Sequence, residues 1–327
     1  MTFFRPSRSN VMNGITSRRG MLLSAIAATC LAAIPAQAQQ PEAKRVKIVA
    51  SFTILADIAK SVAGDRATIT SLVGPNGDAH VYRATPADAK TLKEADLVVV
   101  NGLGFEGFMP RLIKSSGTKA PVITVTTGFK PLEKPKKAAG GHDHGHDHDH
   151  GAKADPHTWQ SIEAAKRAVI NIRDGLVAID AAGGDTYRRN AEAYLASLSA
   201  LKAELDAGFT AIPQEKRVIV TSHDAFRYFA VDFGFRMEAV QGVSTESEPS
   251  AKDVARIIRV TKEKKARAIF IENMANPKIA EQIARESGAK IGGTLFSDAL
   301  SDEKGPAPTY IAMMKHNAKM LIDALKD

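Results

Sequence analysis

Cysteine is almost absent from this sequence, since Cys30 is the only one in 327 residues. A single thiol excludes a disulfide framework and a metal site built from four thiolates. Any metal site would therefore have to use histidine and carboxylate ligands. The hydrophobic content of 44% excludes a disordered tail or a fibre, and the length suffices for two compact units that each bury a core.

Acidic residues are missing from the first 38 positions, which contain four arginines. Without those four, the 44 Lys and Arg residues fall to 40, against 36 Asp and Glu. The formal net charge of +8 therefore falls by half in the rest of the chain. That balance is ordinary for a soluble protein and indicates no nucleic-acid partner.

The same 38 residues have the pattern of a cleaved signal peptide. A pair of arginines precedes an apolar run from Met21 to Pro35, and Ala36-Gln37-Ala38 has the small-x-small form of a leader-peptidase site. The paired arginines are compatible with the Sec or the twin-arginine route. The run is shorter than the about 20 apolar residues of a membrane span. We expect cleavage after Ala38 and export to the periplasm.

Short β-rich runs alternate with amphipathic helical stretches after residue 44, which predicts an α/β fold with parallel sheets covered by helices. Strands are predicted at 46–51, 68–73, 97–101, 122–126, 217–222, 235–240, 268–272 and 290–295. Helices are predicted at 53–62, 86–94, 161–181, 187–205, 250–263, 277–287 and 308–325. We infer two α/β lobes joined by the long helix that ends at Gly183-Gly184.

This organisation divides the chain into four parts. They are the signal peptide (1–38), an N-terminal α/β lobe (39–158), a linker helix (159–182) and a C-terminal α/β lobe (183–327). The first lobe includes a loop at 130–153 that is rich in Lys, Pro, Gly, His and Asp and cannot build a core.

Five of the nine histidines lie in this loop, at His142, His144, His146, His148 and His150. A run of imidazoles on a flexible backbone can bind zinc, copper or nickel in several registers, without a single geometry. We expect auxiliary, weaker metal sites there. A solvated spacer is the alternative.

Three other histidines and one aspartate occupy positions where an open α/β sheet binds ligands. His80 lies in a loop after a strand, His157 precedes the long helix, and His223 and Asp298 follow strands of the second lobe. Three imidazoles and one carboxylate make a tetrahedral set for zinc. A closed shell of four ligands leaves no water to activate, so such a site holds a metal rather than using it in catalysis.

Two further expectations concern the last 30 residues. The ninth histidine, His316, is predicted to lie on the surface of the terminal helix, among lysines. The Asp298 segment, which runs into Ser301–Gly305, is predicted to be the most mobile of the four ligand segments.

Segments around the four positions are characteristic when taken together. They are Asp78-Ala79-His80, Asp155-Pro156-His157-Thr158-Trp159, Thr221-Ser222-His223-Asp224-Ala225-Phe226, Ser244-Thr245-Glu246-Ser247-Glu248-Pro249-Ser250 and Phe296-Ser297-Asp298-Ala299-Leu300. The chain resembles the zinc-binding solute receptors of metal ABC transporters, the cluster A-I family. The resemblance covers nearly the whole chain after the signal peptide, in order.

This resemblance implies a C-clamp fold, two α/β lobes joined by a rigid helix, with Zn²⁺ held in the cleft by His80, His157, His223 and Asp298. It also implies delivery of the ion to an inner-membrane ABC permease. A His-rich loop is typical of the zinc members, and manganese members usually have Glu in place of His223. We further expect a monomer, with a periplasmic zinc chaperone as a candidate partner of the His-rich loop.

Three aspartates are candidates for supporting the ligands. Asp78, Asp155 and Asp224 are close in sequence to the three histidines, and a metal-bound imidazole usually donates its second N–H to a carboxylate or carbonyl. Each is also compatible with a cap or turn role. For Asp155, which precedes a proline, the turn is favoured.

Other functional classes find less support. A zinc hydrolase would need a general base and an open position, but His-Glu-x-x-His and Gly-x-Ser-x-Gly are absent. Residues 102–107 have the spacing of a dinucleotide-binding turn, but Pro110 is expected to cut short the helix after it. We therefore expect no enzyme. A periplasmic zinc buffer or adhesin and a manganese-specific receptor of the same family stay open.

Overall fold

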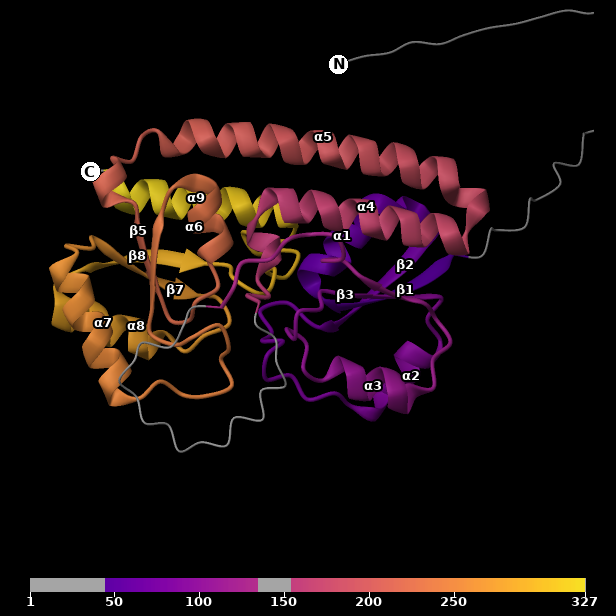
Figure 1. Cartoon of the computed structure of the whole chain (residues 1–327), viewed down its shortest axis with the longest axis horizontal. Coiled ribbons are helices and arrows are strands. Elements are labelled where there is room, and N and C mark those ends of the chain that lie inside the picture. The colour runs from indigo at the N-terminus through magenta and orange to yellow at the C-terminus, as the bar shows by residue number, and fades with distance from the viewer. Residues whose placement is uncertain (1–44, 135–153, 327) are drawn as a thin grey trace, which may run out of the picture. The chain divides into compact units, whose positions relative to one another are not determined.

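The computed structural model describes residues 45–134 and 154–326. These residues belong to one compact unit in which helices cover parallel β-sheets (Figure 1). The predicted α/β fold with parallel sheets is confirmed. The predicted signal peptide and the five histidines from His142 to His150 lie outside the described residues. Within 45–134 and 154–326, no helix combines the length and apolar character that crossing a bilayer requires.

A four-stranded parallel sheet, in the order β2-β1-β3-β4, forms the first half of the unit. Its strands are β1 (Val46–Phe52), β2 (Ala67–Val73), β3 (Leu97–Val100) and β4 (Val122–Thr124). The helices between them are α1 (Thr53–Ala63), a 3-10 helix (Gly64–Arg66), α2 (Pro86–Lys93) and α3 (Met109–Ser116). The central strand β1 is buried almost throughout, as expected for a parallel sheet covered on both faces.

Two long helices follow. They are α4 (Ile162–Ile179) and α5 (Gly184–Phe209), and the 3-10 helix Ala181–Gly183 connects them. Helix α4 packs on α1, β3 and β4, whereas α5 packs on α1, on α4 and on α9 of the second half (Figure 1). Besides α4, which lies within the linker helix predicted at 159–182, α5 therefore also connects the two halves. At 26 residues, or about 39 Å, α5 is long enough to lie along both halves.

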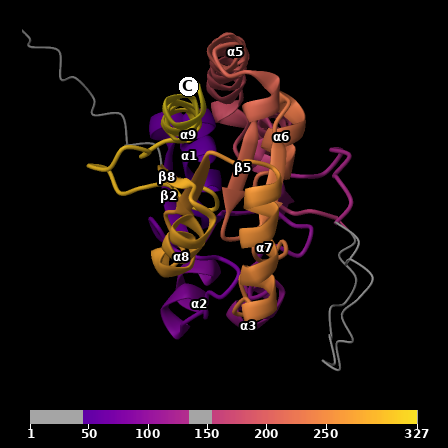
Figure 2. The same cartoon turned by 90° about the vertical axis from the view of Figure 1, so that its left-hand side faces the viewer.

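Four strands in two parallel pairs build the second half. They are β5 (Val218–Thr221) with β6 (Arg236–Ala239), and β7 (Ala268–Glu272) with β8 (Lys290–Leu295). The helices are a 3-10 helix (Gln214–Lys216), α6 (Arg227–Phe233), α7 (Ala251–Glu263), α8 (Pro277–Ser287) and α9 (Tyr310–Leu325). Figure 2 shows α5 and α9 on one side of these strands and α7 and α8 on the other.

One hydrophobic cluster contains residues of both halves, among them Phe52, Trp159 and Tyr310. The hydroxyl of Tyr310 donates to the backbone oxygen of Trp159 at 2.7 Å, so the cluster is tied together where the halves meet. The boundaries of the two predicted lobes stay a prediction.

Candidate metal centre

The four predicted ligands come together between the two halves. His80 lies after β2, His223 after β5 and Asp298 after β8, while His157 precedes a 3-10 helix (Thr158–Gln160) that leads into α4. Three of them thus follow the carboxyl ends of parallel strands, which is where open α/β sheets bind ligands. One nitrogen of each imidazole and an oxygen of Asp298 all lie within 4.8 Å of one another.

The spacing of these atoms suits a single ion. The Nε2 atom of His80 lies 3.4 Å from Nε2 of His157 and 3.5 Å from Oδ2 of Asp298. Nε2 of His223 lies 3.1 Å from Oδ2 of Asp298, and Nε2 of His157 lies 3.8 Å from Oδ1. Ligand atoms at the usual 2.0–2.1 Å from a tetrahedral zinc ion are about 3.3 Å apart. The observed distances bracket that value.

Asp298 is the charged centre of the group. It is fully buried, and neither of its oxygens accepts a well-aligned hydrogen bond from the described residues. Burial alone would raise its pKa, but the attraction of His223 and His157 and the contacts with His223 and His80 hold the pKa of the carboxyl well below its usual range. A buried, ionised carboxylate that lacks aligned donors is a strong cation ligand.

His223 is held between two carboxyl groups. Oε1 of Glu272, the last residue of β7, accepts the backbone N–H of His223 at 2.8 Å, and Oε2 lies 2.6 Å from Nδ1 of the ring. Burial opposes the charged ring, yet the fields of Glu272 and Asp298 raise the pKa of His223 well above its usual range. The contact with Nδ1 leaves Nε2 to face the other ligands.

Glu272 was not predicted. A signal for it was present, because a glutamate ends a buried strand of a parallel sheet, the same argument that selected His223. The predicted partners are aspartates next to each histidine in the sequence, whereas Glu272 is 49 positions from His223.

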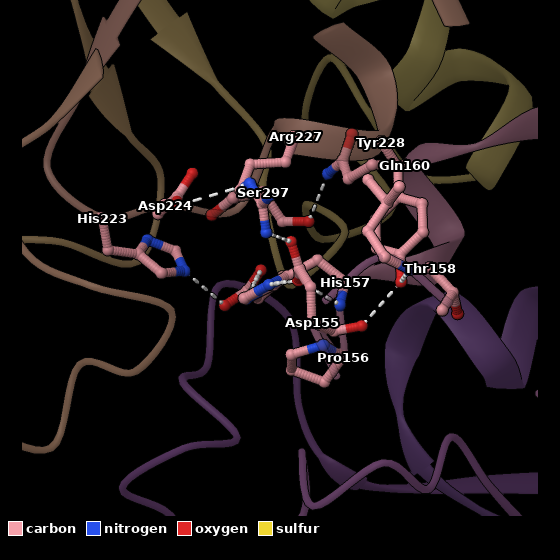
Figure 3. Close-up of polar contacts among 12 residues, drawn as sticks. Asp155, Pro156, His157, Thr158, Gln160, His223, Asp224, Arg227, Tyr228 and Ser297 are labelled. Carbon is pink, nitrogen blue, oxygen red and sulfur yellow. Dashed lines mark hydrogen bonds and ion pairs between the residues drawn. The ribbon is translucent and has the colours of Figure 1, made fainter. Parts of the chain in front are cut away.

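Asp155 orients His157. Its Oδ1 lies 2.8 Å from Nδ1 of the ring and accepts the backbone N–H of His157 at 3.1 Å (Figure 3). The turn role favoured for Asp155 is thus combined with a direct ring contact. Burial lowers the pKa of His157, and the attraction of Asp298 and Asp155 offsets this only in part. The backbone oxygen of Asp155 accepts the hydroxyl of Tyr228 at 2.7 Å, which ties this ligand to α6.

The other two aspartates do not contact the rings in this way. Oδ1 of Asp78 accepts the backbone N–H of His80 at 2.9 Å. Asp224 forms an ion pair with Arg227 at 3.8 Å (Figure 3). Burial, reinforced by Asp155, raises the pKa of Asp224 to about 7.

Aromatic rings form one wall of the centre. The ring of Phe105 packs edge-on against His80, with centroids 4.7 Å apart, and Trp159 packs against Phe105 and His157 at 4.6 and 5.4 Å. Nε1 of Trp159 donates to the backbone oxygen of Ser297 at 2.7 Å. The tryptophan therefore holds both its own segment and the residue before Asp298.

The glycine-rich turn at 102–107 supports this wall. The side chain of Glu106 turns inward and accepts the backbone N–H groups of Asn101 at 2.6 Å and Gly102 at 3.1 Å, together with the Ser51 hydroxyl at 2.6 Å. Burial raises the pKa of Glu106, although these hydrogen bonds oppose the shift. The amides at the start of the turn thus bind the protein's own carboxylate, which disfavours the dinucleotide reading.

His316 lies apart from the four ligands and is not freely exposed, contrary to the prediction. It is half-buried, its Nε2 lies 2.9 Å from the backbone oxygen of Thr294, and its ring packs edge-on against Phe296. The next residue, Asn317, is buried and holds both the N–H and the oxygen of Phe296 at 2.9 and 2.8 Å. Helix α9 thereby fixes the backbone just after β8, which leads to Asp298.

Residues 48–324 match the family described as zinc-uptake complex component A, periplasmic. The chain belongs to this family. Among its relatives, the iron-binding protein YfeA of Yersinia pestis is 37% identical over 272 residues, which cover 83% of this chain and 84% of the relative. The manganese-binding lipoprotein MntA of Halalkalibacterium halodurans is 32% identical over 305 residues, which cover 93% of this chain and 96% of the relative.

Solved structures agree with this assignment. The periplasmic zinc-binding protein TroA from Treponema pallidum has a TM-score of 0.76 at 30% identity, covering 86% of this chain and 99% of that one. The Mn-bound periplasmic metal-binding protein from Candidatus Liberibacter asiaticus has a TM-score of 0.74 at 30% identity, covering 85% and 99%. The protein is thus a periplasmic metal-binding receptor of an ABC transporter, a class of receptors rather than enzymes, and its implied partner is a membrane permease.

Proposed function

We propose that the cargo is Zn²⁺, which His80, His157, His223 and Asp298 capture for high-affinity import through the permease. The proposal is carried by the convergence of three imidazole nitrogens on a buried carboxylate that lacks aligned hydrogen-bond donors among the described residues. A divalent cation would neutralise that carboxylate and accept all four ligands at once.

Manganese and iron are the alternative cargoes. The names of the relatives mention iron and manganese, and TroA is described as zinc-binding. Three nitrogen donors favour zinc, because manganese prefers oxygen ligands. Zinc also outranks manganese at most sites of this kind, so tighter zinc binding alone does not identify the cargo. The ratio of the two dissociation constants is more informative.

Trp159 supplies a direct readout. It is the one tryptophan of the chain, it is 2% exposed, and its ring packs against that of His157. Titration of zinc and of manganese, followed by its fluorescence, should give one tight zinc equivalent per chain, with manganese at least about a hundredfold weaker. His223→Glu replaces a nitrogen by an oxygen donor and should narrow that ratio.

Two imidazole deletions make a matched pair for this experiment. His223→Ala should weaken zinc binding by more than about a hundredfold, because even the loss of a contact to a ligand costs 10–100-fold. His316→Ala should leave the tight equivalent intact, since the His316 ring contacts Thr294 and Phe296 instead. Equal effects of the two changes would refute the ligand assignment.

The His-rich segment needs a separate comparison. We propose that the five histidines from His142 to His150 are weaker auxiliary sites, with a periplasmic zinc chaperone as their partner, and that the receptor is monomeric. Deletion of residues 138–153 should remove weak equivalents in calorimetry and keep the tight one. If the deletion abolished the tight binding step, zinc would bind mainly to the His-rich segment, and the protein would act as a zinc buffer rather than as a receptor.

A further inference from the structure

A hydrogen bond across the centre holds the segment that carries His80. Thr245, between β6 and α7 in the second half, donates its hydroxyl to Oδ2 of Asp78 at 2.7 Å. The other oxygen of Asp78 accepts the backbone N–H of His80 at 2.9 Å. One carboxylate therefore connects Thr245, in the second half, to a ligand that the first half contributes.

The connection from Thr245 through Asp78 to His80 lies on the side of the centre that is nearest to solvent. His157, His223 and Asp298 are fully buried. Among the four ligands, the His80 side chain alone keeps some exposed surface, at 5%, and the nearby Asp78 and Thr245 are half-buried. His80 is therefore the ligand nearest to solvent, and we expect an entering or leaving ion to pass it.

A second pair of contacts holds the beginning of the same segment. The backbone N–H of Asn76 donates to the oxygen of Leu300 at 2.9 Å, and the side chain of Asn273 donates to Oδ1 of Asn76 at 3.0 Å. These contacts lie four residues before His80, whereas Asp78 touches the backbone of His80 itself. Of these contacts between the two halves, the hydrogen bond of the Thr245 hydroxyl therefore acts nearest to His80.

We propose that Thr245 is a positioning residue that acts on metal release: its hydroxyl holds Asp78, and through it His80, in the ligand position. When this hydrogen bond opens, the His80 segment is freed to swing away and the ion can leave past it. The inference rests on the proposed metal binding by the four ligands. It also gives Asp78 a role in place of the ring contact that the sequence suggested.

The test measures how fast zinc leaves. Zinc-loaded full-length protein is mixed with excess chelator in a stopped-flow instrument, and Trp159 fluorescence reports the dissociation rate constant. Thr245→Val keeps the size of the side chain but removes the donor, and should speed dissociation about five- to tenfold, as expected for the loss of one ordinary, partly exposed hydrogen bond. Thr245→Ser restores the hydroxyl and should return the rate to within about twofold of the original.

Ser244→Ala is the matched control, since the Ser244 hydroxyl accepts the backbone N–H of Glu246 within its own segment, whereas Thr245 donates to Asp78. It should leave the rate unchanged. In an Asp78→Ala background, Thr245→Val should add nothing further, because the acceptor is already gone. Thermal unfolding of each metal-free variant verifies that it is folded.

The outcomes separate the two proposals. A wild-type protein without a tight zinc equivalent overturns the proposed function and this inference with it. If the wild type binds zinc tightly but Thr245→Val releases it at the wild-type rate, the positioning role alone is wrong. The same conclusion follows if the serine variant fails to restore the rate, if Ser244→Ala is equally fast, or if the two changes add in full.

Discussion

Each buried histidine of the centre has a carboxylate beside its Nδ1 atom, and that contact decides which nitrogen faces the ion. Asp155 serves His157, and Glu272 serves His223. Both carboxyl groups are fully buried, so each ring loses an alternative orientation when it loses its partner. Such outer contacts raise the basicity of a ligand as well as fixing its direction.

Glu272→Gln should therefore lower zinc affinity about 10–100-fold. The amide keeps one acceptor oxygen, which cannot serve both the backbone N–H and the ring of His223, and its NH₂ group would face a donor. Competition with a fluorescent chelator measures the change, and circular dichroism checks the fold.

Asp224→Asn is the control for this change. Asp224 adjoins His223 in sequence and is also largely buried, but it pairs with Arg227. Because its pKa is raised to about 7, the carboxyl is already partly neutral at neutral pH, and the amide should alter zinc affinity less than about threefold. A loss as large as that of Glu272→Gln would mean that general charge, rather than the ring contact, sets the affinity.

At the scale of elements, the corner between α4 and α5 is fixed by one aspartate. Asp180 accepts two hydrogen bonds from the guanidinium of Arg66, at 2.8 and 3.2 Å, and one from the hydroxyl of Tyr187 at 2.6 Å. Burial opposes ionisation, but Tyr187 and Arg66 prevail and lower the pKa of Asp180. The corner thus depends on a charged carboxylate.

Asp180→Asn should lower the melting temperature of the metal-free protein by about 2–4 °C at pH 7. Because the folded pKa is below the unfolded value of about 3.9, this contribution is complete above that value and disappears as pH falls through the folded pKa. Melting curves at pH 7, 5 and 3 should show the gap between variant and wild type persisting at pH 5 and shrinking at pH 3.

The comparison variant for that corner is Asp185→Asn. Asp185 pairs with Arg188 on the exposed face of α5, so its loss should shift the melting temperature by less than about 1 °C. A gap for Asp180→Asn that stays constant down to pH 3 would show that shape rather than charge holds the corner.

Elements with several agreeing local signals were predictable. Helix α8 spans the predicted residues 277–287 because Asn276 caps it, Pro277 begins it and Gly288 ends it in a left-handed conformation. The eight strands were found within about two residues, since most are short runs rich in apolar and β-branched residues between polar turns.

Two short helices were missed for identifiable reasons. Pro110 was interpreted as a terminator, whereas it is the second residue of α3, a position where proline costs no hydrogen bond. Helix α6 has only seven residues, and its three aromatic side chains are buried among other rings, so no polar stripe marks its period.

The histidines of the centre were predictable one by one, but their partners were not. Strand ends and a helix entrance can be read along the chain, and these select His80, His157 and His223. Contacts such as Glu272 with His223, or Thr245 with Asp78, join segments that meet only after the two halves pack. The sequence around each residue does not show how the two halves pack on each other. Such partners can therefore be identified only from the three-dimensional structure.

At the scale of the whole unit, a bound ion crosslinks the two halves. His80 belongs to the first half, His223 and Asp298 belong to the second, and His157 lies at the entrance to α4. An ion that binds the folded chain alone must stabilise it, by about 4 kcal/mol when free zinc is a thousand times the dissociation constant. The melting temperature should therefore rise with zinc in the wild type and much less in His223→Ala. An equal rise in both would place the stabilising ion elsewhere.

The long helices are expected to keep their shape when the ion binds, rather than bend to bring the two halves closer. Helix α5 packs on α1, α4 and α9, so it connects the two halves along its length without a flexible joint (Figure 1). Zinc should then act locally, on the segments that carry the ligands. Asn317 and Trp159 hold the backbone on the way to Asp298, so we now expect the Asp298 segment to be less mobile than the His80 segment, the opposite of the order predicted from sequence. The His80 segment is the more exposed one.

Hydrogen exchange with and without zinc should follow that order. Added protection should be greatest at residues 74–86 and 241–250, smaller at 221–226 and 295–306, and nearly absent along α4 and α5, whose amides already bond within rigid helices. Because Thr245 joins the first two segments, Thr245→Val should reduce the protection of both while leaving 295–306 unchanged. Broad new protection along 162–179 would instead mean that the halves close about a hinge, and a rigid connection through α5 would have to be abandoned.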